Sequence, residues 1–227
     1  MARNSYTSMF SDAELYYVPR YLNKQEADAL EQEVNDSDKF RRQTLYFKDY
    51  DNPGKVKSVP AWRESYWYGD YPQATQNTKS GIPTDFTDNY PFTPLVSALR
   101  ERLEREFDVC FNACLVGKFI SPNDKIGFHS DKCPGLGNNP YVGSISLGKS
   151  REFLMKHTQT GEITKFILKH GDLILMRDKS NTRYLHAVSK DRMCSPKRYR
   201  INLTFRNYNY DDIERRAGTT SSGGGLK

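Results

Sequence analysis

Short apolar runs, separated by residues that favour turns, follow one another through the second half of the chain. They occupy residues 109–120, 141–147, 152–156, 164–168, 172–176, 184–188 and 199–206. Pairs such as Pro134-Gly135 and Thr160-Gly161 mark the breaks between them. Because no helical pattern intervenes, this succession of short strands favours a β-sandwich or jelly roll.

The first half of the chain contains one short strand pattern, residues 15–18, and two amphipathic helix patterns. Asn23 and Glu26 have the spacing of a capping box at the start of the first helix. Thr93 and Pro94 suit the N-cap and first position of the second. The predicted inner positions are Ala27, Leu30 and Val34 in the first helix and Leu95, Leu99 and Leu103 in the second.

Residues 39–71 interleave aromatic and basic side chains around a predicted turn at residues 51–54, and a polar loop follows at 72–91. Basic side chains can bind phosphates while aromatic faces stack on bases. A twisted hairpin that packs its aromatic residues on the core explains the pattern equally well. The nucleic-acid interpretation names as candidate contacts Arg41, Arg42, Lys48, Lys57, Arg63, Trp67, Tyr68 and Tyr71.

His129 and Asp131 lie two positions apart in an extended segment, so their side chains can face one point in space. His186 would complete two nitrogens and one oxygen, the facial triad of non-haem Fe(II) oxygenases, which leaves coordination positions open. A lone histidine is more often structural. Here, however, two of only four histidines flank a β-rich segment in the right order, and the apolar setting of His186 requires a partner.

The run RINLTFR, residues 200–206, alternates polar and apolar side chains. Positions 200, 202, 204 and 206 share one strand face, so both arginines can reach the same cavity. Surface salt bridges are the alternative for two arginines. Because Ile201, Leu203 and Phe205 would cover the other face, we expect buried arginines that need anions.

Composition agrees with a globular protein that has one sizeable core: 227 residues, 37% hydrophobic and 13% aromatic. A net charge of +6 and a pI near 9.0 favour polyanionic partners. No apolar run has the length of a membrane span, no signal-peptide core is present, and the four cysteines form no C-x-x-C pair. We therefore expect an intracellular monomer, in nucleus or cytoplasm, with reduced thiols.

The motifs together resemble the AlkB family of Fe(II)- and 2-oxoglutarate-dependent dioxygenases. The resemblance runs from about Val59 to Arg206, and RINLTFR is its most specific motif. The others are VPAWRESYWYGDY, FNACLVGKF, KIGFHSDKC, GSISLGKSREF, KHGDLILM and YLHAV. The implied fold is α+β and mainly β, a double-stranded β-helix (jelly roll) with N-terminal helices and a lid. Its implied parts are an extension with a helix (1–38), a nucleotide-recognition lid and loop (39–92), a helix plus the jelly roll (93–210), and a disordered tail (211–227).

The resemblance also assigns site residues. His129, Asp131 and His186 would be the iron ligands. Arg200 would bind the distal carboxylate of 2-oxoglutarate, and Arg206 would lie near the proximal carboxylate and Asp131. Asn202 would add a hydrogen bond, and Phe119 would wall the pocket.

Two departures from the family pattern stand out. The strand before the metal motif commonly carries Asn-x-Tyr, whereas this chain has Gly117-Lys118-Phe119. An amide and a hydroxyl that would bind the co-substrate are therefore missing. Cys133 stands where many nucleobase demethylases have an acidic residue, so weak discrimination between methylated bases is expected.

The implied activity is oxidative demethylation of N-alkylated nucleobases, as in DNA repair or RNA demethylation, with Fe(II), 2-oxoglutarate and O2. Its substrate would be methylated nucleic acid, preferably single-stranded, because a base in a duplex must first leave the stack. Two alternatives remain open at the level of sequence. They are a related dioxygenase acting on a protein or small molecule, and a non-catalytic cupin-like binding module.

Overall fold

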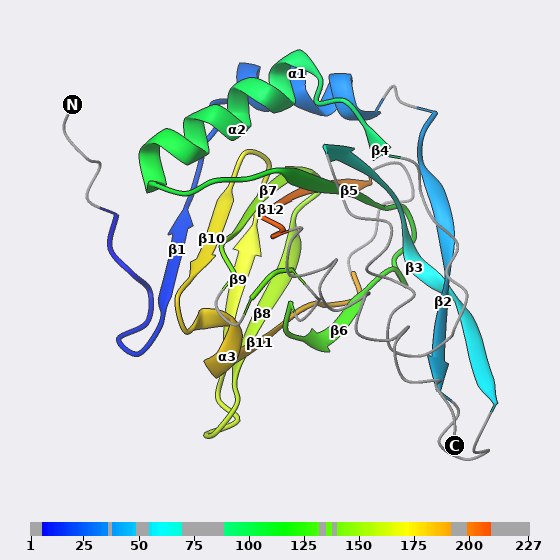
Figure 1. Ribbon diagram of the computed structural model, residues 1–227, viewed down its shortest axis with the longest axis vertical. Helices are drawn as coiled ribbons and strands as arrows, with labels where there is room; N and C mark the ends of the chain where they lie inside the picture. Colours follow the sequence, from blue (N-terminus) through cyan, green and yellow to red (C-terminus); the bar gives the residue numbers. More distant parts are fainter. Residues whose placement is uncertain are drawn as a thin grey trace, which may run out of the picture.

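Two β-sheets form the body of the protein in the computed structural model (Figure 1). The structure describes residues 6–35, 38–48, 55–69, 89–131, 135–137, 140–191 and 199–209. The larger sheet has the order β1 (Glu14–Val18), β10 (Leu173–Arg177), β7 (Val142–Gly148), β12 (Arg200–Arg206), β5 (Ala113–Phe119), β3 (Val56–Gly69) and β2 (Arg41–Lys48), with β4 (Asn89–Tyr90) beside β3. The smaller has the order β6 (Ile126–His129), β11 (Tyr184–Val188), β8 (Arg151–His157) and β9 (Ile163–Leu168). The predicted jelly roll, mainly β, is confirmed.

Two helices cover the outer face of the larger sheet, α1 (Lys24–Asn35) and α2 (Pro94–Phe107) (Figure 1). The capping box of α1 is confirmed: the backbone N–H of Asn23 donates to Glu26 Oε2 at 2.8 Å, and that of Glu26 donates to Asn23 Oδ1 at 3.0 Å. The predicted inner positions of α1 are all buried. A third, one-turn helix is α3 (Ser180–Arg183).

One face of α2 was predicted wrongly. Leu95 is 41% exposed, and Val96 is buried in its place together with Leu99, Leu103 and Phe107. Thr93 makes no side-chain cap; its hydroxyl donates instead to Glu33 of α1. That contact ties the start of α2 to α1 and turns Leu95 toward the groove between the helices.

Strand β12 shows how the sheet separates the core from the site. Ile201, Leu203 and Phe205 are fully buried in the cluster beneath the helices. Side chains at 200, 202, 204 and 206 point the other way, into the space between the two sheets. The predicted two-sided burial of this strand is therefore confirmed, and the strand presents a polar face to the cavity between the sheets.

The N-terminal strand β1 and the aromatic hairpin of β2 and β3 are both part of the larger sheet. β1 pairs with β10 at one edge, and β3 pairs with β5 toward the other. Most of the predicted loop, the turn at 51–54 and the predicted tail lie outside the described residues. No helix in the described part of the chain is long and apolar enough to cross a bilayer.

Candidate active site

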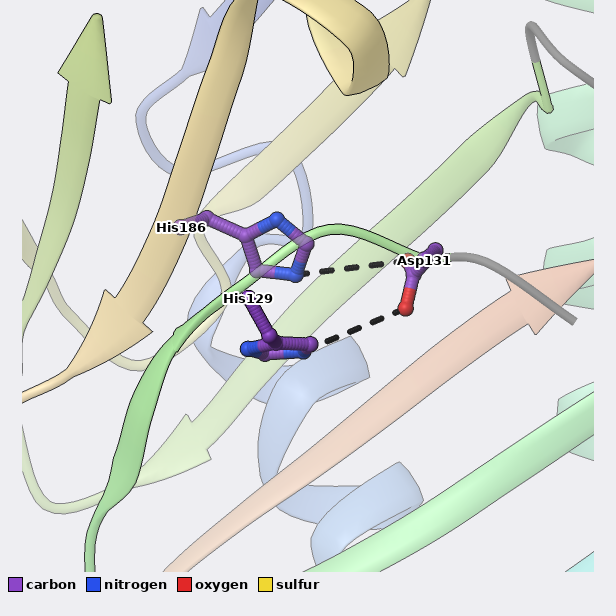
Figure 2. Close-up of side chains that lie close together, drawn as sticks. All are labelled: His129, Asp131 and His186. Atoms are coloured by element: carbon purple, nitrogen blue, oxygen red, sulfur yellow. Dashed lines mark ion pairs between the residues drawn. The ribbon is translucent and has the colours of Figure 1, made fainter. Parts of the chain in front are cut away.

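Three side chains with metal-ligating atoms meet at the open end between the sheets (Figure 2). His129 ends β6 and is the register partner of His186 on β11. Asp131 lies two residues beyond the end of β6 rather than on the strand. Nε2 of His129 lies 4.0 Å from Asp131 Oδ1, and Nε2 of His186 lies 4.0 Å from Oδ2. Two ligands each about 2.1 Å from one ion are at most about 4.2 Å apart, so these separations suit a shared metal.

The protonation states at this cluster favour metal binding. Burial alone would raise the pKa of Asp131, but Arg206 and the two histidines outweigh it and lower that pKa to about 2. Burial lowers the pKa of His186 to about 4, against the opposing effect of Asp131. The carboxylate is thus ionised and His186 neutral at neutral pH, the forms that bind a metal. Nδ1 of His129 lies 2.9 Å from the carbonyl of Gly127, a contact that leaves Nε2 for the ion.

Neighbouring residues hold Asp131 in place. Arg206 donates from Nη2 to Asp131 Oδ1 at 2.9 Å. The backbone N–H of Asp131 donates to Asn181 Oδ1 at 2.7 Å, and Asn181 Nδ2 donates to the Asp131 carbonyl at 2.8 Å. Asn181, buried in α3, carries no sequence pattern that would have identified it. It fixes the backbone of the proposed ligand through two hydrogen bonds.

Arg200 is the most buried cation of the cavity, 2% exposed. Its Nη2 donates to Ser146 Oγ at 2.9 Å and to Asn202 Oδ1 at 2.6 Å. Asn202 Nδ2 donates in turn to Thr204 Oγ1 at 2.6 Å. The amide that was expected to contact the co-substrate therefore holds Arg200 in place. Ser146 alternates with apolar residues on β7, a pattern that could have marked it as facing the cavity.

The unpaired atoms of Arg200 show whether a carboxylate co-substrate fits the cavity. Nε and Nη1 of Arg200 are buried and have no hydrogen-bond partner among the described residues, and the same holds for Asp131 Oδ2. Burial and the charges of Arg151 and Arg63 lower the pKa of Arg200 to about 9. The guanidinium of Arg200 is still charged at neutral pH, and no acidic side chain among the described residues pairs with it. The residues present fit Fe(II) at the three ligands and 2-oxoglutarate beside Arg200.

Phe119 and Gly117 of β5 both line the cavity. The Phe119 ring centroid lies 5.2 Å from the guanidinium carbon of Arg200, so the ring supports the arginine by a cation–π contact. The side chain of Arg63 covers Gly117. Arg63 therefore lines the cavity instead of the outer surface expected for a nucleic-acid contact.

The other candidate nucleic-acid contacts divide by exposure. Arg41 and Lys57 are exposed on the hairpin, and Arg42 pairs with Asp124 at 3.6 Å. Trp67 and Tyr68 are 7% and 0% exposed, which corrects their expected role in stacking. They pack into the core, as the alternative interpretation of the hairpin expected. The Lys48 side chain, Tyr71 and Cys133 lie outside what the structure describes.

Two aromatic rings, on β3 and β6, are exposed instead. Trp62 on β3 is 47% exposed, with Lys125 Nζ 5.6 Å from its ring centroid. Phe128 on β6 is 40% exposed, with Lys156 Nζ 5.7 Å away. Each ring is adjacent in sequence to a cavity residue, Arg63 or His129. A ring with a lysine over it offers both stacking and charge.

Comparisons with known proteins agree with this site. Residues 14–206 match the model of the 2OG-Fe(II) oxygenase superfamily. An uncharacterised protein of Acanthamoeba polyphaga mimivirus is 30% identical over 65% of this chain and 74% of its own length. Alpha-ketoglutarate-dependent dioxygenase alkB homolog 3 of Rattus norvegicus is 30% identical over 73% of the chain. DNA oxidative demethylase ALKBH2 of Mus musculus is 31% identical over 67% of the chain.

The chain spans 56% of the rat protein and 64% of the mouse protein. The solved structure of OsALKBH1 superposes with a TM-score of 0.54 over 88% of this chain and 100% of that one, at 19% identity, a likeness of fold. The family model and the relatives agree with an iron site at His129, Asp131 and His186. The chain belongs to the 2OG-Fe(II) oxygenase superfamily and is an AlkB-like member of it.

Proposed function

We propose that this protein removes methyl groups from nitrogen atoms of nucleobases by Fe(II)- and 2-oxoglutarate-dependent oxidation, and that it prefers single-stranded DNA or RNA. The observation that carries the proposal is the meeting of three ligands with the free Nε and Nη1 of Arg200 in one cavity. A metal binding site alone has many uses. A metal site beside an unpaired buried guanidinium is suited to a carboxylate co-substrate.

The protein's own residues supply binding and orientation. His129, Asp131 and His186 hold the metal, and Arg206 keeps Asp131 ionised and fixed. Arg200, positioned by Ser146 and Asn202, binds the far carboxylate of 2-oxoglutarate through its two free nitrogens, Nε and Nη1. When bound, iron and co-substrate supply the oxidation of the methyl group, which leaves as formaldehyde.

Nucleic acid as the substrate rests on three observations. Relatives with about 30% identity are named as alkB homolog 3 and DNA oxidative demethylase. The net charge of +6 favours a polyanion. The exposed rings of Trp62 and Phe128, each with a lysine over it, resemble the stacking platforms that bind single strands without reading sequence.

The test is co-substrate turnover. Protein, Fe(II), ascorbate and 2-oxoglutarate are incubated with a methylated single-stranded oligonucleotide, and succinate and formaldehyde are measured. Equal amounts of both products, dependent on the methyl group, support the proposal. No succinate under any condition would indicate the non-catalytic binding module, and succinate without formaldehyde from nucleic acid would indicate another substrate.

A further inference from the structure

Arg63 occupies a place in the cavity that a glycine leaves open. Gly117 on β5 has no side chain, and a Cβ added there would lie 2.9 Å from Cδ and 3.0 Å from Nε of Arg63. Arg63 comes from β3, and β5 lies between β3 and β12 in the sheet. Gly117 is the register partner of Asn202. The arginine therefore crosses β5 toward the wall that carries Arg200 and Arg206.

The charge of this cavity is not balanced by its own residues. Among the described lining residues, Arg63, Arg200 and Arg206 carry three positive charges and Asp131 one negative charge, so the formal sum is 3 − 1 = +2, with the histidines neutral. A divalent metal adds to this excess. Within the part of the chain that the structure describes, Arg63 forms no hydrogen bond or ion pair. Arg63 is only partly buried, but a partly buried guanidinium without an anion is still costly unless a ligand supplies one.

The side chain of Arg63 lies between the other two arginines of the cavity. It covers Gly117, which pairs with Asn202, and Asn202 lies between Arg200 and Arg206 on β12. Arg200, with its free Nε and Nη1, serves the far end. Position 117 has no side chain and Phe119 has no polar group, so β5 contributes no side-chain donor between them.

We propose that Arg63 binds 2-oxoglutarate as a third co-substrate arginine, which supplies the donors absent from β5. The inference rests on the proposed function, because it takes 2-oxoglutarate as the ligand of the cavity. It removes Arg63 from the nucleic-acid surface and explains why a small residue is required at position 117.

The experiment measures the dissociation constant of 2-oxoglutarate by calorimetry with Mn(II) in place of iron, so that binding is read without turnover. Arg63→Met keeps the length of the side chain and removes its donors. It should weaken binding about tenfold to a hundredfold, the loss expected for one hydrogen bond to a charged group. Arg63→Lys keeps the charge without the planar fork and should fall between. Arg105→Ala, an exposed arginine on α2 that is no candidate contact, is the control and should bind as the wild type does.

A second pair of variants tests the spatial relation. Gly117→Asn alone displaces Arg63, because the new Cβ would contact it at 2.9 Å, and should weaken 2-oxoglutarate binding. In Arg63→Ala with Gly117→Asn, the amide enters the vacated space and should restore part of the affinity lost in Arg63→Ala. Melting temperatures without ligand confirm that each variant is folded.

Unchanged 2-oxoglutarate affinity in Arg63→Met would overturn the inference. So would unchanged co-substrate affinity together with weaker binding of a single-stranded oligonucleotide, which would assign Arg63 to the substrate. Failure of the wild-type protein to bind 2-oxoglutarate with Mn(II) would instead remove the proposed function, and this inference with it. The two failures are therefore distinguishable in one titration series.

Discussion

Arg200→Met should separate the stability of the protein from its ability to bind the co-substrate. In the ligand-free protein this substitution removes two hydrogen bonds, to Ser146 and Asn202. It also removes a buried charge with two unpaired N–H groups, which is repelled by Arg63 and Arg151. Replacing a poorly compensated buried charge with an apolar side chain is often neutral or stabilising. We expect the free energy of unfolding to change by less than about 1 kcal/mol, or to rise.

The ligand-bound protein should respond in the opposite sense. Two charge-assisted hydrogen bonds, each contributing about 1.5–3 kcal/mol, would be lost, which weakens binding at least about a hundredfold. At a 2-oxoglutarate concentration of about 100 times the wild-type dissociation constant, the wild type gains about 2.7 kcal/mol of stability. A variant that binds a hundredfold more weakly gains only about 0.4 kcal/mol under the same conditions.

The assay is chemical denaturation with Mn(II), with and without 2-oxoglutarate, on the wild type, Arg200→Met and Arg200→Lys. Arg105→Ala, an exposed arginine on α2, is the control. The lysine variant should keep less than half of the wild-type stabilisation, because it loses the fork. If Arg200→Met unfolds far more easily without ligand and is still stabilised by 2-oxoglutarate, Arg200 is a structural residue and the reasoning fails.

Three further predictions follow from the same geometry. His129→Ala and Asp131→Ala should each abolish turnover and Mn(II) binding, measured by calorimetry, while the metal-free protein stays folded; near-normal activity in both would contradict the metal site. Phe119→Tyr should tighten 2-oxoglutarate binding a few-fold by adding a hydroxyl, and weaker binding would show that the hydroxyl cannot reach the ligand. Trp62→Ala should weaken binding of a single-stranded oligonucleotide about tenfold, the loss of about one stacked base, in an anisotropy titration at stated salt. Ile163→Ala, an exposed residue on β9, is the control for it, and equal affinity in both variants would exclude stacking on Trp62.

The pattern of strands and the types of candidate metal-ligating residue predicted most of the fold and of the candidate site. The alternation of polar and apolar residues at 200–206 predicted which face of β12 points into the cavity. This was possible because both faces of β12 are covered, so a shift by one residue would bury the wrong side chains. The order of His129, Asp131 and His186 was informative because few side chains can bind a metal. The structure brings the three together, with Asp131 beyond the strand that was expected to carry it.

The hairpin was harder to interpret, because its neighbours decide which face is buried. Trp67 and Tyr68 are adjacent and face opposite sides of β3, yet both are buried. Tyr68 packs in the core cluster beneath the helices, and Trp67 packs with Leu115 and Tyr208. Arg63 faces the cavity because Gly117 leaves space there, a relation between two strands that sequence spacing does not contain. On α2, Leu95 and Val96 fit the helical stripe equally well. The structure buries Val96 in the core cluster and leaves Leu95 exposed.

The central claim is that this cavity demethylates nucleobases. Its most direct test is a competition followed by mass spectrometry, in which single-stranded oligonucleotides carrying 1-methyladenine or 3-methylcytosine and a methylated peptide share one reaction with Fe(II), 2-oxoglutarate and ascorbate. Both oligonucleotides should lose their methyl groups, at rates that differ by no more than about 200-fold, the upper limit of the discrimination that pocket shape alone provides. The peptide should remain unchanged. Demethylation or hydroxylation of the peptide, with both oligonucleotides intact, would contradict the account.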